Sequence, residues 1–127
     1  MPADSLPLMS GRRILIVEDE HFLTNRVRTE LERLNVDIVG PIPVGEEADR
    51  LALTVDAAIL DIEIPPNWAF PLAERLQRIR LPYVFAVRGD QARFSEGFPG
   101  FLLSPDPEAL ASIARALFGA PPPDRSV

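Results

Sequence analysis

Five short runs of apolar residues punctuate the chain and predict its strands. The run at Ala57–Leu60 shows no alternation of apolar and polar positions, which indicates a strand buried on both faces of a sheet. It ends at a lone acidic residue, Asp61, and Pro65 and Pro66 then favour a loop. The predicted strands are Arg13–Val17, Val36–Val39, Ala57–Leu60, Tyr83–Val87 and Phe101–Leu103.

Between these runs, apolar residues recur at spacings of three and four, which is the pattern of an amphipathic helix. The last of these segments also carries end signals. Pro107 stands at its start, Asp106 or Ser104 can cap it, and Gly119 follows its end. The predicted helices are His21–Leu34, Glu46–Leu53, Trp68–Ile79 and Pro107–Phe118.

Two aromatic residues, Trp68 and Phe70, open the predicted helix that follows Asp61. The periodicity groups Phe70 and Ile79 with the inward-facing residues of this helix. We therefore expect both aromatic side chains to pack in the core, with contact to a partner protein as the alternative.

Strands and helices alternate, which implies parallel strands joined by right-handed crossovers. We expect an α/β protein, a flavodoxin-like doubly wound (βα)5 sandwich whose five-stranded parallel sheet has the order 2-1-3-4-5. Between Val87 and Gly100, two glycines and a proline leave little room for a helix, so the fourth helix should be short or missing. The domain should span residues 12–119, between a flexible leader (1–11) and a flexible tail (120–127).

Composition excludes several classes of function. A chain of 127 residues suits one domain, and it lacks an apolar run of the roughly 18 residues that a membrane span needs. A net charge of −6 argues against a nucleic-acid surface. There is no cysteine, and the N-terminus lacks a signal-peptide pattern, so we expect a cytoplasmic protein without disulfides or thiolate metal sites.

Acidic residues follow two strands that should be neighbours in such a sheet. Glu18 and Asp19 come directly after the first strand, and Asp61 closes the third. Carboxylates that share a pocket repel each other, and a divalent cation relieves that repulsion. Oxygen ligands with room for water suit Mg²⁺. The alternative is that these acids at strand ends are only solvated loop residues. We take Glu18, Asp19 and Asp61 as a candidate Mg²⁺ site.

With these acidic residues at its strand ends, the sequence resembles the receiver domain of bacterial two-component response regulators over nearly all of residues 12 to 118. By this resemblance Asp61 would accept a phosphoryl group, while Glu18, Asp19, Asp61 and the backbone carbonyl of Glu63 would hold Mg²⁺. The phosphodonor would be a sensor histidine kinase, of the HWE type by the same resemblance, or a phosphotransfer protein. The matching segments are Ile14–Glu20, Ile59–Asp61 with Pro65, Leu81–Ala86 and Ser104–Pro105.

Two positions depart from the receiver pattern. Val87 stands where receivers carry the threonine or serine that binds the phosphoryl group, and Ser104 stands where they carry a lysine. All 13 basic residues are arginines, so no lysine elsewhere can take that place. Arg88 is a possible substitute cation, although a solvated side chain, or a pair with an acid such as Glu18, is the simpler interpretation. Ser104 can donate a weak hydrogen bond or cap the last helix.

Two functions remain open at this point. One is a stand-alone receiver in a phosphorelay that is phosphorylated on Asp61 with Mg²⁺ and signals by protein contact. The other is a degenerate receiver that binds its protein partner regardless of phosphorylation. An enzyme is not expected, because there is no glycine-rich nucleotide loop and Glu63 replaces the second aspartate that a phosphatase would need. The downstream partner would be a protein, with neither nucleic acid nor membrane involved.

Overall fold

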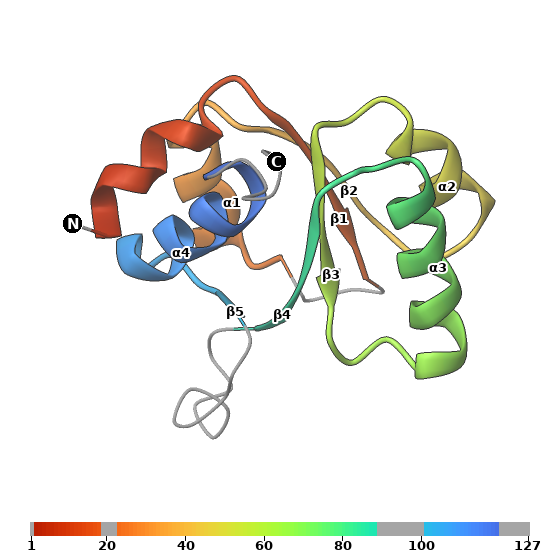
Figure 1. Ribbon diagram of the computed structural model, residues 1–127. Helices are drawn as coiled ribbons and strands as arrows, with labels where there is room; N and C mark the ends of the chain where they lie inside the picture. Colours follow the sequence, from red (N-terminus) through yellow and green to blue (C-terminus); the bar gives the residue numbers. More distant parts are fainter. Residues whose placement is uncertain (1, 19–22, 89–100, 120–127) are drawn as a thin grey trace.

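The computed structural model describes residues 2–18, 23–88 and 101–119 and forms one parallel sheet of five strands (Figure 1). The strand order is β2-β1-β3-β4-β5, and all neighbouring strands pair in parallel, as predicted. The fold is therefore a flavodoxin-like α/β sandwich. The strands are β1 (Arg13–Val17), β2 (Asp37–Ile42), β3 (Ala57–Asp61), β4 (Tyr83–Arg88) and β5 (Phe101–Leu103).

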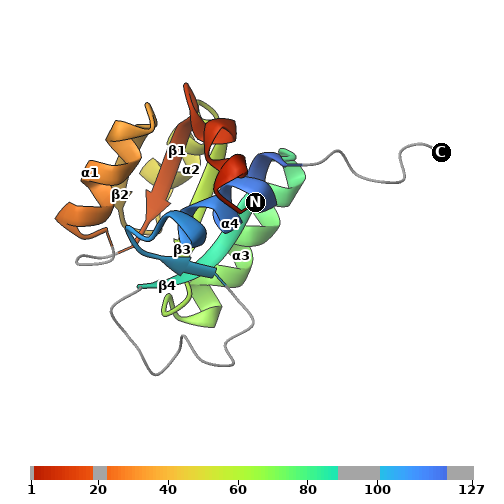
Figure 2. The same ribbon diagram turned by 90° about the vertical axis from the view of Figure 1, so that its left-hand side faces the viewer.

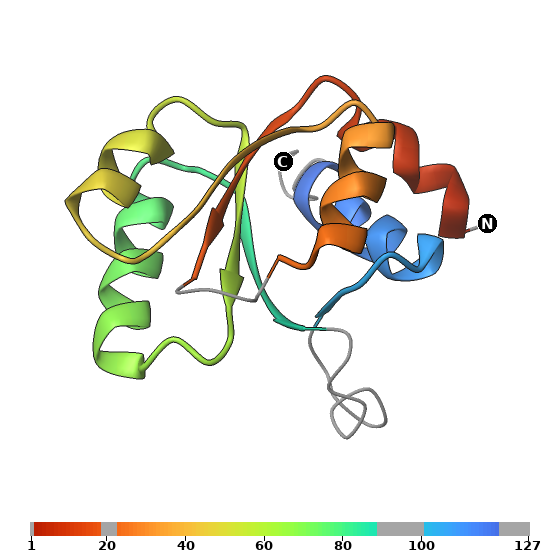
Figure 3. The same cartoon turned by 180° about the vertical axis from the view of Figure 1, so that it is seen from behind.

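Helices cover both faces of this sheet (Figures 1 and 3). In β1, Ile14 and Ile16 pack on the side of α1 and α4, whereas Leu15 and Val17 pack on the side of α2 and α3. All four side chains are fully buried, which explains why the strand sequence shows no polar alternation. The helices are α1 (Asn25–Arg33), α2 (Glu46–Ala52), α3 (Pro66–Arg78) and α4 (Pro107–Phe118).

The segment expected to be a flexible leader is instead part of the packed structure. Residues Pro2–Met9 form the 3-10 helix η1, which lies against α4 (Figure 2). Met9 is fully buried in the cluster beneath α1 and α4, and Leu6 and Leu8 pack against that cluster. The guanidinium of Arg12 stacks on the ring of Phe118 with 4.4 Å to the ring centroid. The prediction was wrong because it rested on the prolines and polar residues of the segment, whereas its apolar residues pack against the core.

Helices α2 and α4 begin at the predicted residues, whereas α1 begins at Asn25 and its predicted start, His21, lies outside the described residues. Thr24 caps α1 by accepting a hydrogen bond from the amide of Val27 at 3.2 Å. Asp106, one of the two expected caps, caps α4 by accepting from the amide of Glu108 at 3.2 Å. Helix α3 begins at Pro66, two residues before the predicted start, because proline is well suited to the first helical position. The expected short fourth helix and the tail lie outside the described residues.

The two aromatic side chains of α3 do not lie in the core. Trp68 is 54% exposed and Phe70 is 68% exposed, and Ile79 at the helix end is 42% exposed. Each helical residue turns by about 100°, so Trp68 and Phe70 flank Ala69 on opposite edges of the buried stripe. The residues that fill the core are Ala69, Leu72, Ala73 and Leu76.

A glycine allows β2 to approach β1 just before the end of β1. The pairing of β1 with β2 shifts register between Leu15 and Val17, and Gly40 lies there with φ +104°. A Cβ atom on Gly40 would lie 2.7 Å from the carbonyl oxygen of Ile16, which is closer than real Cβ contacts allow. Gly40 thus helps to fix the backbone that leads into Glu18.

We expect Gly40→Ala to lower the free energy of unfolding by about 1–3 kcal/mol, because it combines left-handed backbone strain with a backbone clash. Gly11→Ala is the matched control, since Gly11 also has positive φ (+79°) but nothing within 4 Å of its Cβ position. Urea unfolding of both variants separates strain from clash. Equal losses in the two variants would contradict the role of the close approach.

Met9→Ala should lower the free energy of unfolding by about 2–5 kcal/mol, because it removes a fully buried side chain of η1. Leu53→Ala provides the comparison, as Leu53 is 70% exposed, and should change stability by less than about 0.5 kcal/mol. Thermal or urea unfolding followed by circular dichroism measures both. A loss at Met9 no larger than at Leu53 would mean that η1 does not contribute to the fold.

Candidate functional site

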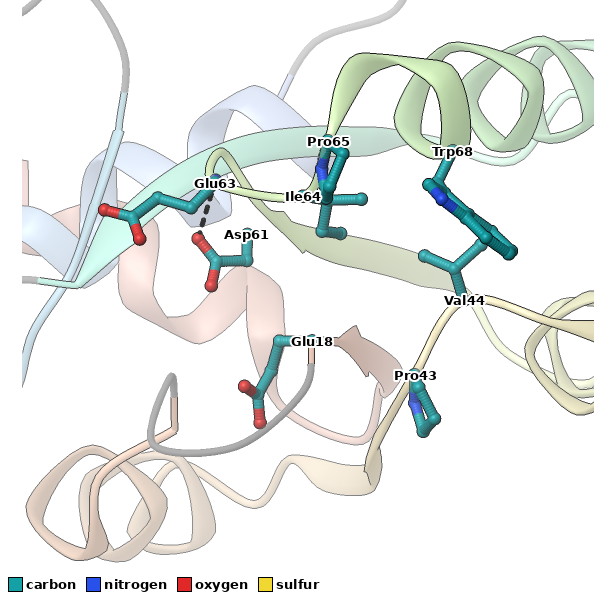
Figure 4. A pocket seen from close by; sticks show the side chains of 8 residues that line it. All are labelled: Glu18, Pro43, Val44, Asp61, Glu63, Ile64, Pro65 and Trp68. Carbon is teal, nitrogen blue, oxygen red and sulfur yellow. Dashed lines mark hydrogen bonds between the residues drawn. The ribbon is translucent and has the colours of Figure 1, made fainter.

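The pairing of β1 with β3 brings two of the expected acidic residues together. Val17 is paired with Leu60, so Glu18 and Asp61 follow at the same edge of the sheet. Both line one pocket of about 500 Å³ (Figure 4). The loops that follow β2 and β3 complete its wall. The lining residues are Glu18, Pro43, Val44, Asp61, Glu63, Ile64, Pro65 and Trp68.

Asp61 is held by the turn that follows it. The amide of Glu63 donates a hydrogen bond to Asp61 Oδ1 at 2.9 Å, drawn as the dashed line in Figure 4. The amide of Ile64 donates to the carbonyl oxygen of Asp61 at 3.1 Å, and the amide of Ile62 donates to the carbonyl oxygen of Ala86 at 2.9 Å. These bonds tie the turn to β4 and fix the direction of the Asp61 carboxylate.

Glu18 is buried, with 2% of its surface exposed. Its amide donates to the carbonyl oxygen of Ile42 at 3.0 Å, which anchors the residue between β1 and β2. Burial of a carboxylate is costly unless charged or polar groups compensate it, and Asp61 adds a second negative charge to the same pocket. A pocket that contains two carboxylates therefore favours cations over anions.

The donor chemistry of Glu18 and Asp61 fits Mg²⁺, because both are hard oxygen ligands with space beside them for water. Asp19, the third expected carboxylate, lies outside the described residues. Within residues 2–18, 23–88 and 101–119, no three acidic, histidine or cysteine side chains gather closely enough to hold a metal. The roles of Asp19 and of the Glu63 carbonyl remain predictions.

The two positions that depart from the receiver pattern both have a local structural role, Val87 in the core and Ser104 in a turn. Val87 lies one residue before the end of β4, opposite Leu102, and is 1% exposed, so its side chain contributes to the core. Ser104 follows β5, and its hydroxyl accepts a hydrogen bond from the amide of Asp106 at 3.0 Å. Arg88 ends β4, but its side chain lies outside the described part of the chain, so its role as a substitute cation stays a prediction.

The pocket also has an apolar end that the sequence pattern did not predict. In Figure 4, Glu18, Asp61 and Glu63 lie at one end and Val44, Pro65 and Trp68 at the other. Trp68 reaches the pocket because it stands in the first turn of α3, beside the loop after β2. The one signal in the sequence was its position two residues after Pro66.

No family model and no curated protein matches the sequence. Solved structures do match this topology. The response regulator PhyR from Brucella abortus matches in structure, with TM-score 0.58 and 23% identity over 91% of this chain and 51% of that one. The chain has a receiver fold. A mutant of the anti-anti-sigma factor PhyR from Bartonella quintana gives TM-score 0.60 and 21% identity, over 91% of this chain and 52% of that one.

The chain spans about half the length of each of the two PhyR structures. At this level of identity the likeness establishes the fold, which confirms the predicted architecture. Among the described helices, none has both the length and the apolar character needed to cross a bilayer.

If Glu18 and Asp61 hold Mg²⁺, the ion should stabilise the folded chain. The expected gain is about 2.7 kcal/mol at an Mg²⁺ concentration 100 times the dissociation constant. Glu18→Gln should remove most of this gain, whereas Glu63→Gln should keep it, because only the backbone carbonyl of Glu63 is an expected ligand. Thermal unfolding with and without Mg²⁺ measures the effect. A full Mg²⁺ response in Glu18→Gln would argue against the site.

Proposed function

We propose that this protein is a response-regulator receiver that accepts a phosphoryl group on Asp61 and passes the signal on by protein–protein contact. The observation that carries the proposal is the position of Asp61 at the carboxyl end of β3, in one pocket with the buried carboxylate of Glu18. Ligands of open α/β sheets bind at this end of the strands. The receiver fold supports the same reading.

The Asp61 carboxylate is the nucleophile in the proposed reaction. One of its oxygens forms a bond to the phosphorus atom of the donor, and the bond from phosphorus to the donor's leaving group breaks. The hydrogen bond from the Glu63 amide to Oδ1 fixes the orientation of the carboxylate before the reaction. Bound Mg²⁺ would supply positive charge that offsets the charge of the phosphoryl oxygens.

The groups that stabilise the phosphoryl group in other receivers are altered here. The sequence has no lysine, and Val87 is an apolar core residue with no hydrogen bond to offer. A charge-assisted hydrogen bond contributes about 1.5–3 kcal/mol, so loss of the lysine should weaken stabilisation of the phosphoryl group about tenfold or more. Arg88 is the candidate replacement. We expect the usual switch of β4 to be lost or changed.

A second candidate function is a protein-binding module that works without phosphorylation. The burial of Val87 and the use of the Ser104 hydroxyl in the turn before α4 favour it, because neither side chain is set to respond to a phosphoryl group. The retained Asp61 and Glu18 favour the first function. Under both proposals the partners are proteins. A sensor histidine kinase or a phosphotransfer protein is the expected donor in the first.

Intact-mass analysis after incubation with acetyl phosphate and Mg²⁺ tests the first function. We expect one phosphoryl adduct in the wild type that requires Mg²⁺ and is lost in Asp61→Asn. Asp56→Asn is the matched control and should keep the adduct, because Asp56 lies before β3 at the opposite edge of the sheet and binds the amide of Arg13.

Two outcomes would contradict the proposal. An adduct that persists in Asp61→Asn would place the phosphoryl group on another residue. No adduct in the folded wild type, with either acetyl phosphate or phosphoramidate as the donor, would favour the phosphorylation-independent binding module instead.

A further inference from the structure

The pocket at Asp61 extends well beyond the carboxylates. Its volume of about 500 Å³ lies in the range of sites that bind drug-sized ligands, far more than a phosphoryl group and a metal ion fill. Its second end is lined by the apolar residues Pro43, Val44, Ile64, Pro65 and Trp68. Trp68 leaves 54% of its surface exposed there. We call this part of the pocket the apolar end.

The inference about this apolar end rests on the function proposed above, in which Asp61 accepts a phosphoryl group. A protein donor would carry the phosphoryl group on a histidine, and that histidine must enter this pocket because the Asp61 carboxylate lies in it. In the transfer, the bond between phosphorus and the histidine nitrogen breaks and a bond to an Asp61 oxygen forms. The nitrogen keeps the electron pair, and the ring leaves as neutral imidazole because its other nitrogen carries a proton.

We propose that the apolar end receives an apolar side chain of the phosphodonor protein, adjacent to its phosphohistidine, with Trp68 as the main contact. Tryptophan is enriched among residues that dominate binding energy at protein interfaces. Trp68 stands on the first turn of α3, a rigid element, while Val44 comes from the loop after β2 and Ile64 from the loop after β3. Docking at this end would hold the imidazole near the carboxylate.

Charge favours a donor protein over a second copy of this chain as the occupant. Two copies would each bring a net charge of −6, and their Asp61 pockets carry the same sign. Like charges across an interface oppose association. A donor with basic residues around its histidine would be attracted to the acidic end while its apolar side chain fills the other.

The test compares a small donor with one that can reach the apolar end. Acetyl phosphate is the small donor. The second is a helical peptide of about 20 residues, rich in alanine and arginine, with one histidine phosphorylated by phosphoramidate. Leucines four residues before and after the histidine lie on its face of the helix. In the paired peptide, serines replace both leucines.

We expect Trp68→Ala to slow phosphorylation of Asp61 by the leucine peptide about tenfold more than it slows phosphorylation by acetyl phosphate. The wild type should prefer the leucine peptide over the serine peptide by a similar factor. Trp68→Phe should restore part of the rate. Phe70→Ala is the control on the same helix, because Phe70 is 68% exposed but does not line the pocket.

Fluorescence gives a second readout, because Trp68 is the sole tryptophan of the sequence. Binding of the unphosphorylated leucine peptide should shift the fluorescence emission of Trp68, whereas addition of the serine peptide should not. Equal rates of wild type and Trp68→Ala with the leucine peptide would overturn the inference while leaving the proposed function intact. Failure of every donor to label wild-type Asp61 would overturn both, so the two failures are distinguishable.

Discussion

The parallel pairing of β1 with β3 is the constraint on which the site depends. Because Val17 is opposite Leu60, the residues that follow them, Glu18 and Asp61, must emerge at one edge of the sheet. The two side chains line one pocket, in which Glu18 is buried and Asp61 is partly exposed. Elements distant in sequence are thereby combined into one acidic site, and the backbone alone is enough to do it.

The burial of Glu18 distinguishes this site from a pair of surface acids. A carboxylate that is 2% exposed reduces stability unless the fold compensates its charge, and a solvated loop residue would carry no such cost. The hydrogen bond from its amide to Ile42, and the close approach of β2 allowed by Gly40, keep it there. A buried acid at this place suits a pocket that binds a cation, whereas the described side chain of Val87 in β4 is an apolar core residue that offers no hydrogen bond to a phosphoryl group.

The aromatic residues of α3 show that hydrophobic residues next to a buried helical position can themselves be exposed. Ala69 faces the sheet, and this leaves its neighbours Trp68 and Phe70 at the two edges of the buried stripe. Hydrophobicity alone assigns both aromatic residues to the core, since it does not record which small residue the helix packs most closely. The pocket beside Asp61 consequently gains an apolar end that no motif announces.

The sequence by itself determined the alternation of strands and helices, the two-sided burial of Ala57–Leu60 and the positions of Asp61 and Glu18 at strand ends, because apolar runs, proline signals and lone acids are local features. It also determined Asp106 as a candidate cap of α4. Only the tertiary structure decided that η1 packs against α4 through Met9, that Val87 is a core residue, and that Trp68 faces the pocket. Each of these depends on which element lies opposite, and contacts between distant segments leave no periodic trace in the chain.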